Sequence, residues 1–327
     1  MSRAVLPPPL PQFEVRLRAP DLSAWLQGNT GVRGFTTRES GHAGPHVALV
    51  ALTHGNEIAG AIVLDRLLRA GLRPERGKLT FGFANLAAFA RFDPRQPTAS
   101  RFVDEDMNRV WDPAVLDGPR RSYELERARA IRPLIDTVDV LLDLHSMLWP
   151  SDPLILSGAS EKGRRLACGI GVPGLVVTDS GHANGRRIID YPRFTDPDTV
   201  AAANLVEAGL HWEPETVETT LASVAGLLRH AGLVTNDPLL PPPSRQPLRL
   251  AEVTLAVTAL TANFTFVQAY RGGEIVSEQN TLIAVDGTRE IRTPHDQCLL
   301  VMPSLRPSRG HTAIRLARFA DTLSAMA

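Results

Sequence analysis

The chain has 327 residues, of which 43% are apolar and 21% are charged, and its formal net charge is zero. These proportions are those of a globular protein long enough for one large domain and a smaller one. Without a basic excess the chain is not expected to bind nucleic acid, and without an apolar run of about 18 residues it is not expected to enter a membrane.

The N-terminus and the cysteine content predict a cytoplasmic protein. Residues 1–12 are rich in proline and lack the apolar core that a signal peptide needs. Cys168 and Cys298 are the only cysteines, too few for a disulfide framework in a chain of this length. Whether the protein is a monomer or a homo-oligomer stays open at this point.

From residue 46 to residue 236, predicted strands alternate with predicted helices. The apolar run 46–52 is typical of a strand buried on both faces, and residues 56–70 carry apolar side chains at helical spacing. Further strands are predicted at 78–85, 139–144, 154–157, 175–178 and 202–206, and further helices at 122–135 and 214–230. This alternation indicates an α/β fold, with a mixed and mostly parallel sheet flanked by helices.

A proline-rich segment, residues 237–247, divides the chain and is interpreted as a stiff linker. Residues 248–327 show short strand patterns separated by turns, which predicts a small C-terminal all-β domain. Residues 1–236 are then the larger domain, and the N-terminal extension 1–45 is expected to pack on it.

Histidine and carboxylate side chains fall near the ends of predicted strands. His54 and Glu57 follow the first strand, and His145 follows the strand at 139–144. Strands of an open α/β sheet carry their sites at the carboxyl ends, so these side chains can converge. A catalytic zinc site takes three such ligands and leaves a fourth position for water. Each residue taken alone is more typical of an ordinary helix start or strand end, and it is the combination that indicates a metal site.

Glu207 is the candidate for proton transfer. It follows the apolar strand at 202–206, where burial would raise its pKa and suit it to exchange protons at neutral pH. The alternative is an exposed glutamate at a strand end. Asp143, two residues before His145, is either an orienting partner for that ring or a turn residue.

Three residues between the predicted strands at 78–85 and 139–144 are candidates for binding negatively charged oxygen atoms of a substrate. Arg101 can stabilise an oxyanion beside a metal ion. Asn108 and Arg109 offer the donors that hold a carboxylate, the arginine through a planar fork. The alternative is a set of surface ion pairs with the acidic residues at 104–106.

Together these motifs resemble those of the succinylglutamate desuccinylase and aspartoacylase family, a branch of the zinc carboxypeptidase fold. The resemblance covers about residues 45–235, and its motifs are HGNE at 54–57, DMNR at 106–109, DLHS at 143–146 and EAGLH at 207–211. It implies a zinc carboxypeptidase-like fold with one Zn²⁺ per chain, bound by His54, Glu57 and His145. It also implies that Glu207 is the general acid/base, that Arg101 polarises the scissile carbonyl, and that Asn108 and Arg109 hold the substrate's α-carboxylate.

The implied reaction is hydrolysis of a small N-acyl amino acid, of the N-acetyl or N-succinyl type. Family members read the acyl group with further arginines and tyrosines, for which the candidates here are Arg186, Arg187, Tyr191 and Arg193. The alternative for this segment is a solvated loop. The alternative function is that of a metallocarboxypeptidase acting on short peptides.

Overall fold

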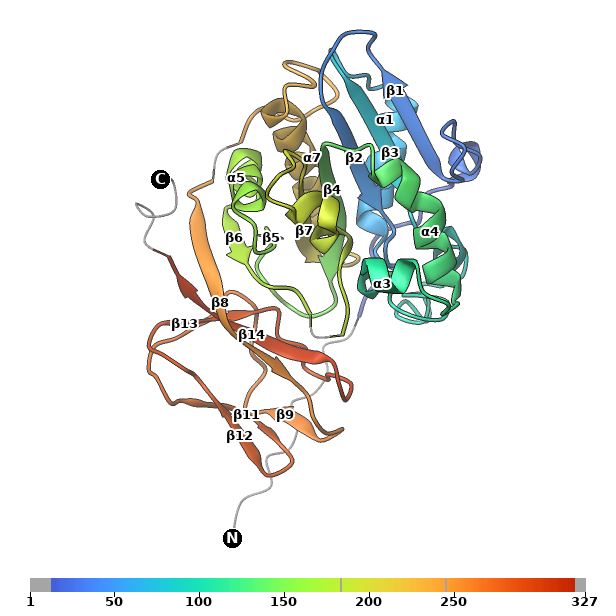
Figure 1. The fold of residues 1–327 in the computed structure, drawn as a ribbon. Helices are drawn as coiled ribbons and strands as arrows, with labels where there is room; N and C mark the ends of the chain where they lie inside the picture. Colours follow the sequence, from blue (N-terminus) through green and yellow to red (C-terminus); the bar gives the residue numbers. More distant parts are fainter. Residues whose placement is uncertain (1–12, 183, 245, 321–327) are drawn as a thin grey trace.

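A mixed sheet runs through most of the molecule (Figure 1), and the computed structural model describes residues 13–182, 184–244 and 246–320. Within these residues the sheet has 11 strands. Their spatial order is β1 (Phe35–Glu39), β3 (Lys78–Phe83), β2 (His46–Ala51), β4 (Val140–Met147), β7 (Ala202–Leu210), β5 (Leu154–Leu156), β6 (Leu175–Thr178), β8 (Arg249–Thr258), β14 (Thr312–Phe319), β13 (Cys298–Val301) and β10 (Ile275–Val276). The predicted α/β class is confirmed.

Helices cover both faces of the first part of this sheet. The longer ones are α1 (Ile58–Ala70), α4 (Tyr123–Ile135), α5 (Glu161–Ile170) and α7 (Pro214–His230), and the short ones are α2 (Leu86–Phe89), α3 (Pro113–Leu116) and α6 (Pro192–Thr195). Short 3₁₀ turns lie at Ser23–Trp25, Met107–Arg109 and Ile188–Asp190. Helices α1, α5 and α7 share one apolar core, and α3, α4 and α6 contribute to the core on the other face.

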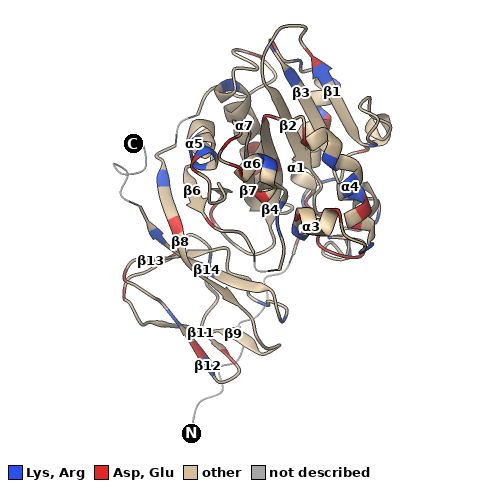
Figure 2. Cartoon of the chain, viewed as in Figure 1, with Lys and Arg blue, Asp and Glu red and all other residues tan. Residues whose placement is uncertain are grey.

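Strand β2 shows why the centre of the sheet forms. All six of its residues are buried and none is Lys, Arg, Asp or Glu, so the strand is tan in Figure 2. It pairs in parallel with β3 on one side and with β4 on the other. Its side chains alternate between the two cores, with Val47 and Leu49 in one and Ala48 and Val50 in the other. An apolar run of this kind is stable only between two covered faces.

Two strands are longer than their apolar runs predicted. Strand β4 continues to Met147 and β7 continues to Leu210, so His145 and Glu207 lie within strands. The two strands pair in parallel, and His145 is the direct partner of Glu207. Backbone pairing between segments distant in sequence therefore carries both strands past the point at which their apolar pattern stops.

The C-terminal strands continue the central sheet. Strand β8 pairs in parallel with β6, from Leu175 opposite Arg249 to Thr178 opposite Glu252. A separate antiparallel sheet is formed by β12 (Arg289–Arg292), β11 (Leu282–Asp286) and β9 (Phe264–Phe266). The C-terminal part is rich in β-structure, as predicted, but the main sheet crosses the proline-rich segment.

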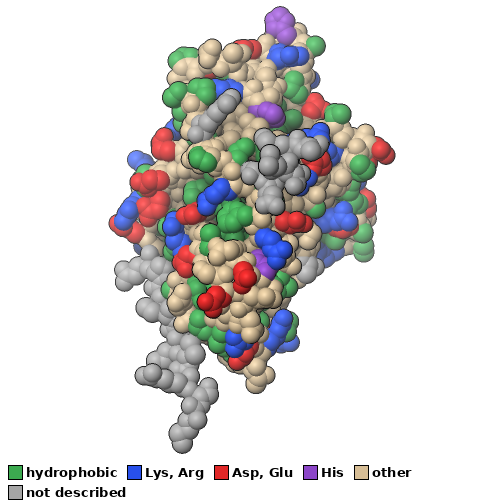
Figure 3. Space-filling view, turned by 90° about the vertical axis from the view of Figure 1, so that its left-hand side faces the viewer, with side chains coloured by type: hydrophobic (Ala, Val, Ile, Leu, Met, Phe, Trp, Pro, Cys, Tyr) green, Lys and Arg blue, Asp and Glu red, His purple; other side chains and the backbone are tan. Residues whose placement is uncertain are grey.

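The described part of the N-terminal extension packs on the larger unit. It contributes β1 at the edge of the sheet, while residues 1–12 lie outside the described part of the chain. The ring centroid of Phe13 lies 5.5 Å from that of Trp149 and 6.0 Å from that of Trp212. On the face drawn in Figure 3, positive and negative side chains are interspersed, as a zero net charge suggests. Among the described residues no helix has the length and apolar character needed to cross a bilayer.

Candidate metal centre and substrate cavity

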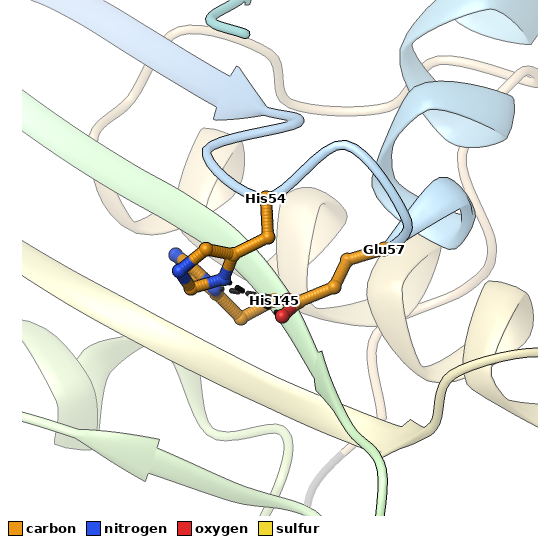
Figure 4. Close-up of side chains that lie close together, drawn as sticks. All are labelled: His54, Glu57 and His145. Carbon is orange, nitrogen blue, oxygen red and sulfur yellow. Dashed lines mark hydrogen bonds and ion pairs between the residues drawn. The ribbon is translucent and has the colours of Figure 1, made fainter. Parts of the chain in front are cut away.

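His54, Glu57 and His145 meet at the carboxyl ends of β2 and β4 (Figure 4). After β2 the chain turns through Leu52, which has a φ of 59°, an uncommon left-handed conformation for a residue other than glycine. His54 lies in the next turn, and Glu57 is the last residue before α1. All three side chains are buried, and one ligand atom from each lies within 4.8 Å of the others. The structure thus brings the three predicted metal ligands together.

The ring orientations suit metal binding. The Nδ1 atoms of His54 and His145 lie 2.7 and 3.0 Å from the two carboxylate oxygens of Glu57. The opposite Nε2 atoms lie 2.8 Å from Asp106 and 2.6 Å from Asp143. A ring that donates Nε2–H to a carboxylate keeps a lone pair on Nδ1, and carboxylates commonly orient metal-binding histidines in this way. Two imidazoles and a carboxylate are a donor set that zinc accepts.

The charges at this centre stabilise one another. Burial opposes the charge of Glu57, but the rings of His54 and His145 hold the pKa of its carboxyl group well below the ordinary value. Burial likewise opposes a charge on His145, but Asp143 and Glu57 raise the pKa of its ring well above the ordinary value. Glu57 is therefore a carboxylate anion, which is the form that binds a cation.

Glu207 faces the same centre from β7. Its side chain is 7% exposed, and its Oε2 atom has no hydrogen-bond partner among the described residues. Burial, together with the charge of Glu57, raises the pKa of Glu207 to about 8. A carboxyl group that titrates near neutrality can both accept and release a proton at working pH. This is the environment that the sequence predicted.

Arg101 and Arg109 line the cavity beside these residues. The Arg101 guanidinium donates to Glu57 at 3.0 Å and to Asp106 at 3.3 Å. Arg109 donates to the carbonyl of Asn108 at 2.7 Å. Burial, together with the charge of nearby arginines, lowers the pKa of Arg109 to about 10 against the attraction of Asp106. Such crowded positive charge favours the binding of an anion.

Asn108 lies beside the histidines instead of lining the cavity. Its side-chain carbonyl accepts the backbone N–H of Ile188 at 2.9 Å. Its amide nitrogen lies 3.4 Å from Asp143 and 3.3 Å from Nε2 of His145. In this structure Asn108 therefore holds the Asp143–His145 pair.

The structure does not bring Arg187 or Arg193 to the cavity. Arg187 is 1% exposed, and its guanidinium pairs with Asp179 at 2.7 Å and with Asp190 at 2.7 Å. Arg193 donates to the carbonyl of Val138 at 2.7 Å. The neighbouring candidates also have protein partners, with Arg186 paired to Asp112 and Tyr191 donating to Asp136.

The cavity has a volume of about 440 Å³. Several of its lining residues were not among the predicted site residues, namely Leu148, Trp149, His182, His211 and Arg315. Arg315 comes from β14 in the C-terminal part and is 3% exposed. The signal that could have identified it is a single charged residue within the apolar run at 313–317. A fully buried arginine in a strand is rare without a partner or a ligand.

Sequence comparison relates the first part of the chain to known enzymes. Residues 43–155 match the family model of the succinylglutamate desuccinylase/aspartoacylase catalytic domain. An N-acyl-aromatic-L-amino acid amidohydrolase (carboxylate-forming) A of Danio rerio is 32% identical over 110 residues, which are 31% of this chain and 32% of that protein. An aspartoacylase of Xenopus tropicalis is 31% identical over 109 residues, 31% of this chain and 33% of that protein. The chain matches about a third of the length of these curated relatives.

Similarity of fold extends over most of the chain. A succinylglutamate desuccinylase from Vibrio cholerae superposes with a TM-score of 0.66 at 17% identity, covering 88% of this chain and 86% of that one. A succinylglutamate desuccinylase/aspartoacylase from Rhodobacter sphaeroides gives 0.62 at 18% identity, covering 88% and 89%. The three metal-ligand candidates lie within the sequence match, whereas Glu207 and Arg315 lie outside it.

Proposed function

Because residues 43–155 belong to the succinylglutamate desuccinylase/aspartoacylase catalytic-domain family, we propose that this protein is a metal-dependent hydrolase that removes the acyl group from an N-acyl amino acid. The observation that carries the proposal is the arrangement of Glu207, which lines the cavity beside the buried set of His54, Glu57 and His145 and has a buried oxygen without a hydrogen-bond partner among the described residues. This is a general acid/base next to a site for a cation.

A single zinc ion is the proposed cofactor, held by His54, Glu57 and His145. Bound zinc lowers the pKa of a water molecule to about 7 and polarises a carbonyl group. Asp106 and Asp143 keep the two rings in position, and Asn108 supports the second of these pairs.

The remaining chemistry falls to the residues around the cation. Glu207 accepts a proton from the attacking water and passes it to the leaving amine, which a pKa near neutrality permits. Arg101 donates to the oxygen on which negative charge develops, an interaction whose loss typically costs about 3–4 kcal/mol. Arg109 binds the α-carboxylate of the substrate.

The test is a metal analysis of the purified protein, followed by a hydrolysis screen over N-acyl amino acids with and without a chelator. We expect close to one zinc ion per chain, release of the free amino acid, and loss of activity on chelation that added zinc restores. Hydrolysis that persists after complete metal removal would overturn the proposal.

The same screen distinguishes the proposed deacylase from the alternative, a metallocarboxypeptidase. Short peptides with a free C-terminus are assayed beside the N-acyl amino acids at equal concentration. We expect poor cleavage of peptides, because Arg315 and Met302 of the C-terminal part form one wall of the cavity. Faster cleavage of peptides than of any N-acyl amino acid would replace the proposed deacylase by a peptidase.

A further inference from the structure

Two smaller side cavities share lining residues with the main cavity. One, of about 290 Å³, shares Arg109 and His182 with the main cavity. The other, of about 60 Å³, shares Leu148 and His211 with it. The two side cavities have no lining residue in common. A substrate held at the metal centre can therefore extend in two directions.

The first direction carries charges of both signs, because Glu105 and Asp106 line its side cavity beside Arg109. The Arg315 guanidinium donates through Nε to Asp179 at 3.1 Å, and its Nη2 atom lies 2.8 Å from Nε2 of His182. Asp179 is shared with Arg187, which also pairs with Asp190. Arg109 and Arg315 nevertheless place two guanidinium groups on the wall of the main cavity, where they can bind a carboxylate.

The second direction is apolar and bordered by negative charge. Phe13, Leu148, Leu210 and Trp212 line the small side cavity. The charged residues beside it are Glu14 and Glu213, and both pair with the single guanidinium of Arg16 at 2.9 Å. An anionic group placed here would lose its hydration and meet an excess of carboxylate.

We propose that the substrate is an N-acyl amino acid with an uncharged, apolar acyl group. This inference rests on the proposed function, because it places the scissile amide at the His54–Glu57–His145 centre. The α-carboxylate and the acyl group lie on opposite sides of that amide. With the carboxylate at the Arg109 and Arg315 end, the acyl group lies toward Phe13 and Leu148, where a succinyl group would bring its second carboxylate beside Glu14.

Butyryl and succinyl derivatives of one amino acid provide the test, because they have four-carbon acyl chains and differ by the terminal carboxylate. We expect kcat/KM of the zinc-loaded enzyme to favour the butyryl over the succinyl derivative by roughly tenfold or more. The butyryl derivative with an α-carboxamide should be a poor substrate. Equal or faster hydrolysis of the succinyl derivative would overturn the inference and leave the proposed function intact, whereas failure to hydrolyse any derivative would overturn the function itself.

Two variants test the acyl end directly. Glu14 is exposed, and Glu14→Lys should raise the succinyl-to-butyryl ratio of kcat/KM several-fold, since it reverses a charge beside the side cavity. Phe13→Ala should lower the butyryl-to-acetyl ratio, since it removes apolar contact with the longer chain. The control is Glu252→Lys, an equivalent charge reversal at an exposed position of β8, which should leave both ratios unchanged. If Glu14→Lys and Glu252→Lys behave alike, or if Phe13→Ala leaves its ratio unchanged, the acyl group does not lie at this end.

Discussion

At Glu207 the fold keeps a carboxyl oxygen buried with no partner in the described part of the protein. Leaving a buried polar group unpaired costs about 1–3 kcal/mol, a cost that natural structures seldom carry without a functional reason. The direct pairing of Glu207 with His145 across β4 and β7 explains how the residue is held there. The position combines the proximity to the metal centre and the raised pKa that proton transfer needs.

Replacing Glu207 by glutamine should therefore separate metal binding from turnover. The variant keeps the shape of the side chain and all three metal ligands, so we expect about one zinc ion per chain. Without a group that exchanges protons, kcat should fall by roughly 100-fold to 10,000-fold. Metal content and kcat, measured on the same preparation, test the retained zinc binding and the loss of turnover. Near-normal turnover would remove Glu207 from the mechanism.

Arg315 permits a second prediction at the scale of single residues. Arg315→Met should raise KM for substrates with a free α-carboxylate by roughly 10-fold to 100-fold, the equivalent of one hydrogen bond to a charged group. The α-carboxamide analogue should be affected far less. Arg318→Met is the matched control, because Arg318 is an exposed arginine of the same strand. A melting curve is needed, since the change also removes a partner of Asp179; equal losses for both substrates would argue for a purely structural role.

The sequence identified some site residues and not others for a physical reason. His54, Glu57, His145 and Glu207 could be predicted because each lies close to a buried strand, and strand ends converge. Arg187 could not be excluded, because its two carboxylate partners come from the turn at Ile188–Asp190 and from Asp179, which directly follows β6. Arg315 could not be placed, because its position depends on pairing between β14 and β8.

Among the structural elements, the turn between β2 and α1 carries two of the three candidate metal ligands, His54 and Glu57. Gly55 donates its backbone N–H to the carbonyl of Arg101 at 3.0 Å. A Cβ atom at Gly55 would lie 2.5 Å from backbone atoms of Ala88, Phe89 and Ser100. The turn is thus packed against two other backbone segments and has no room for a side chain.

Gly55→Ala should consequently damage the metal centre and the fold together. We expect a loss of about 1–3 kcal/mol in the free energy of unfolding, typical of overpacking, with reduced zinc content. Gly71→Ala is the control, because Gly71 has a φ of 85° but no atom near the position of an added Cβ. It should cost about 1 kcal/mol and leave the zinc content unchanged. Denaturant unfolding measures the loss of stability in both variants, and metal analysis measures their zinc content. Unaltered zinc binding in Gly55→Ala would show that the turn tolerates displacement.

At the scale of the whole molecule, the proline-rich segment is not a boundary in the sheet. A linker is predicted from composition, whereas the pairing of β6 with β8 arises from contacts that composition does not encode. The C-terminal part also supplies Arg315 to the cavity. The larger unit predicted at residues 1–236 therefore shares both its sheet and its site with the C-terminal strands.

Truncation after residue 236 tests this continuity. The fragment keeps His54, Glu57, His145 and Glu207, but β6 becomes an open edge strand with unpaired backbone groups. We expect it to aggregate or to unfold at a much lower temperature than the full chain, and to lack deacylase activity. Size-exclusion chromatography and circular dichroism are the measurements. A monomeric fragment with a cooperative transition near that of the full chain would establish an independent domain.

The place of β14 in the chain has a consequence for biosynthesis. Translation proceeds from the N-terminus, so the three candidate metal ligands emerge from the ribosome long before Arg315 does. A nascent chain can bring its candidate ligands together around a cation before β14, which carries Arg315, has been synthesised. The proposed selectivity toward substrate is thus the last property to be assembled, and a chain interrupted before β14 would have its candidate metal centre without the part of the cavity wall that Arg315 supplies.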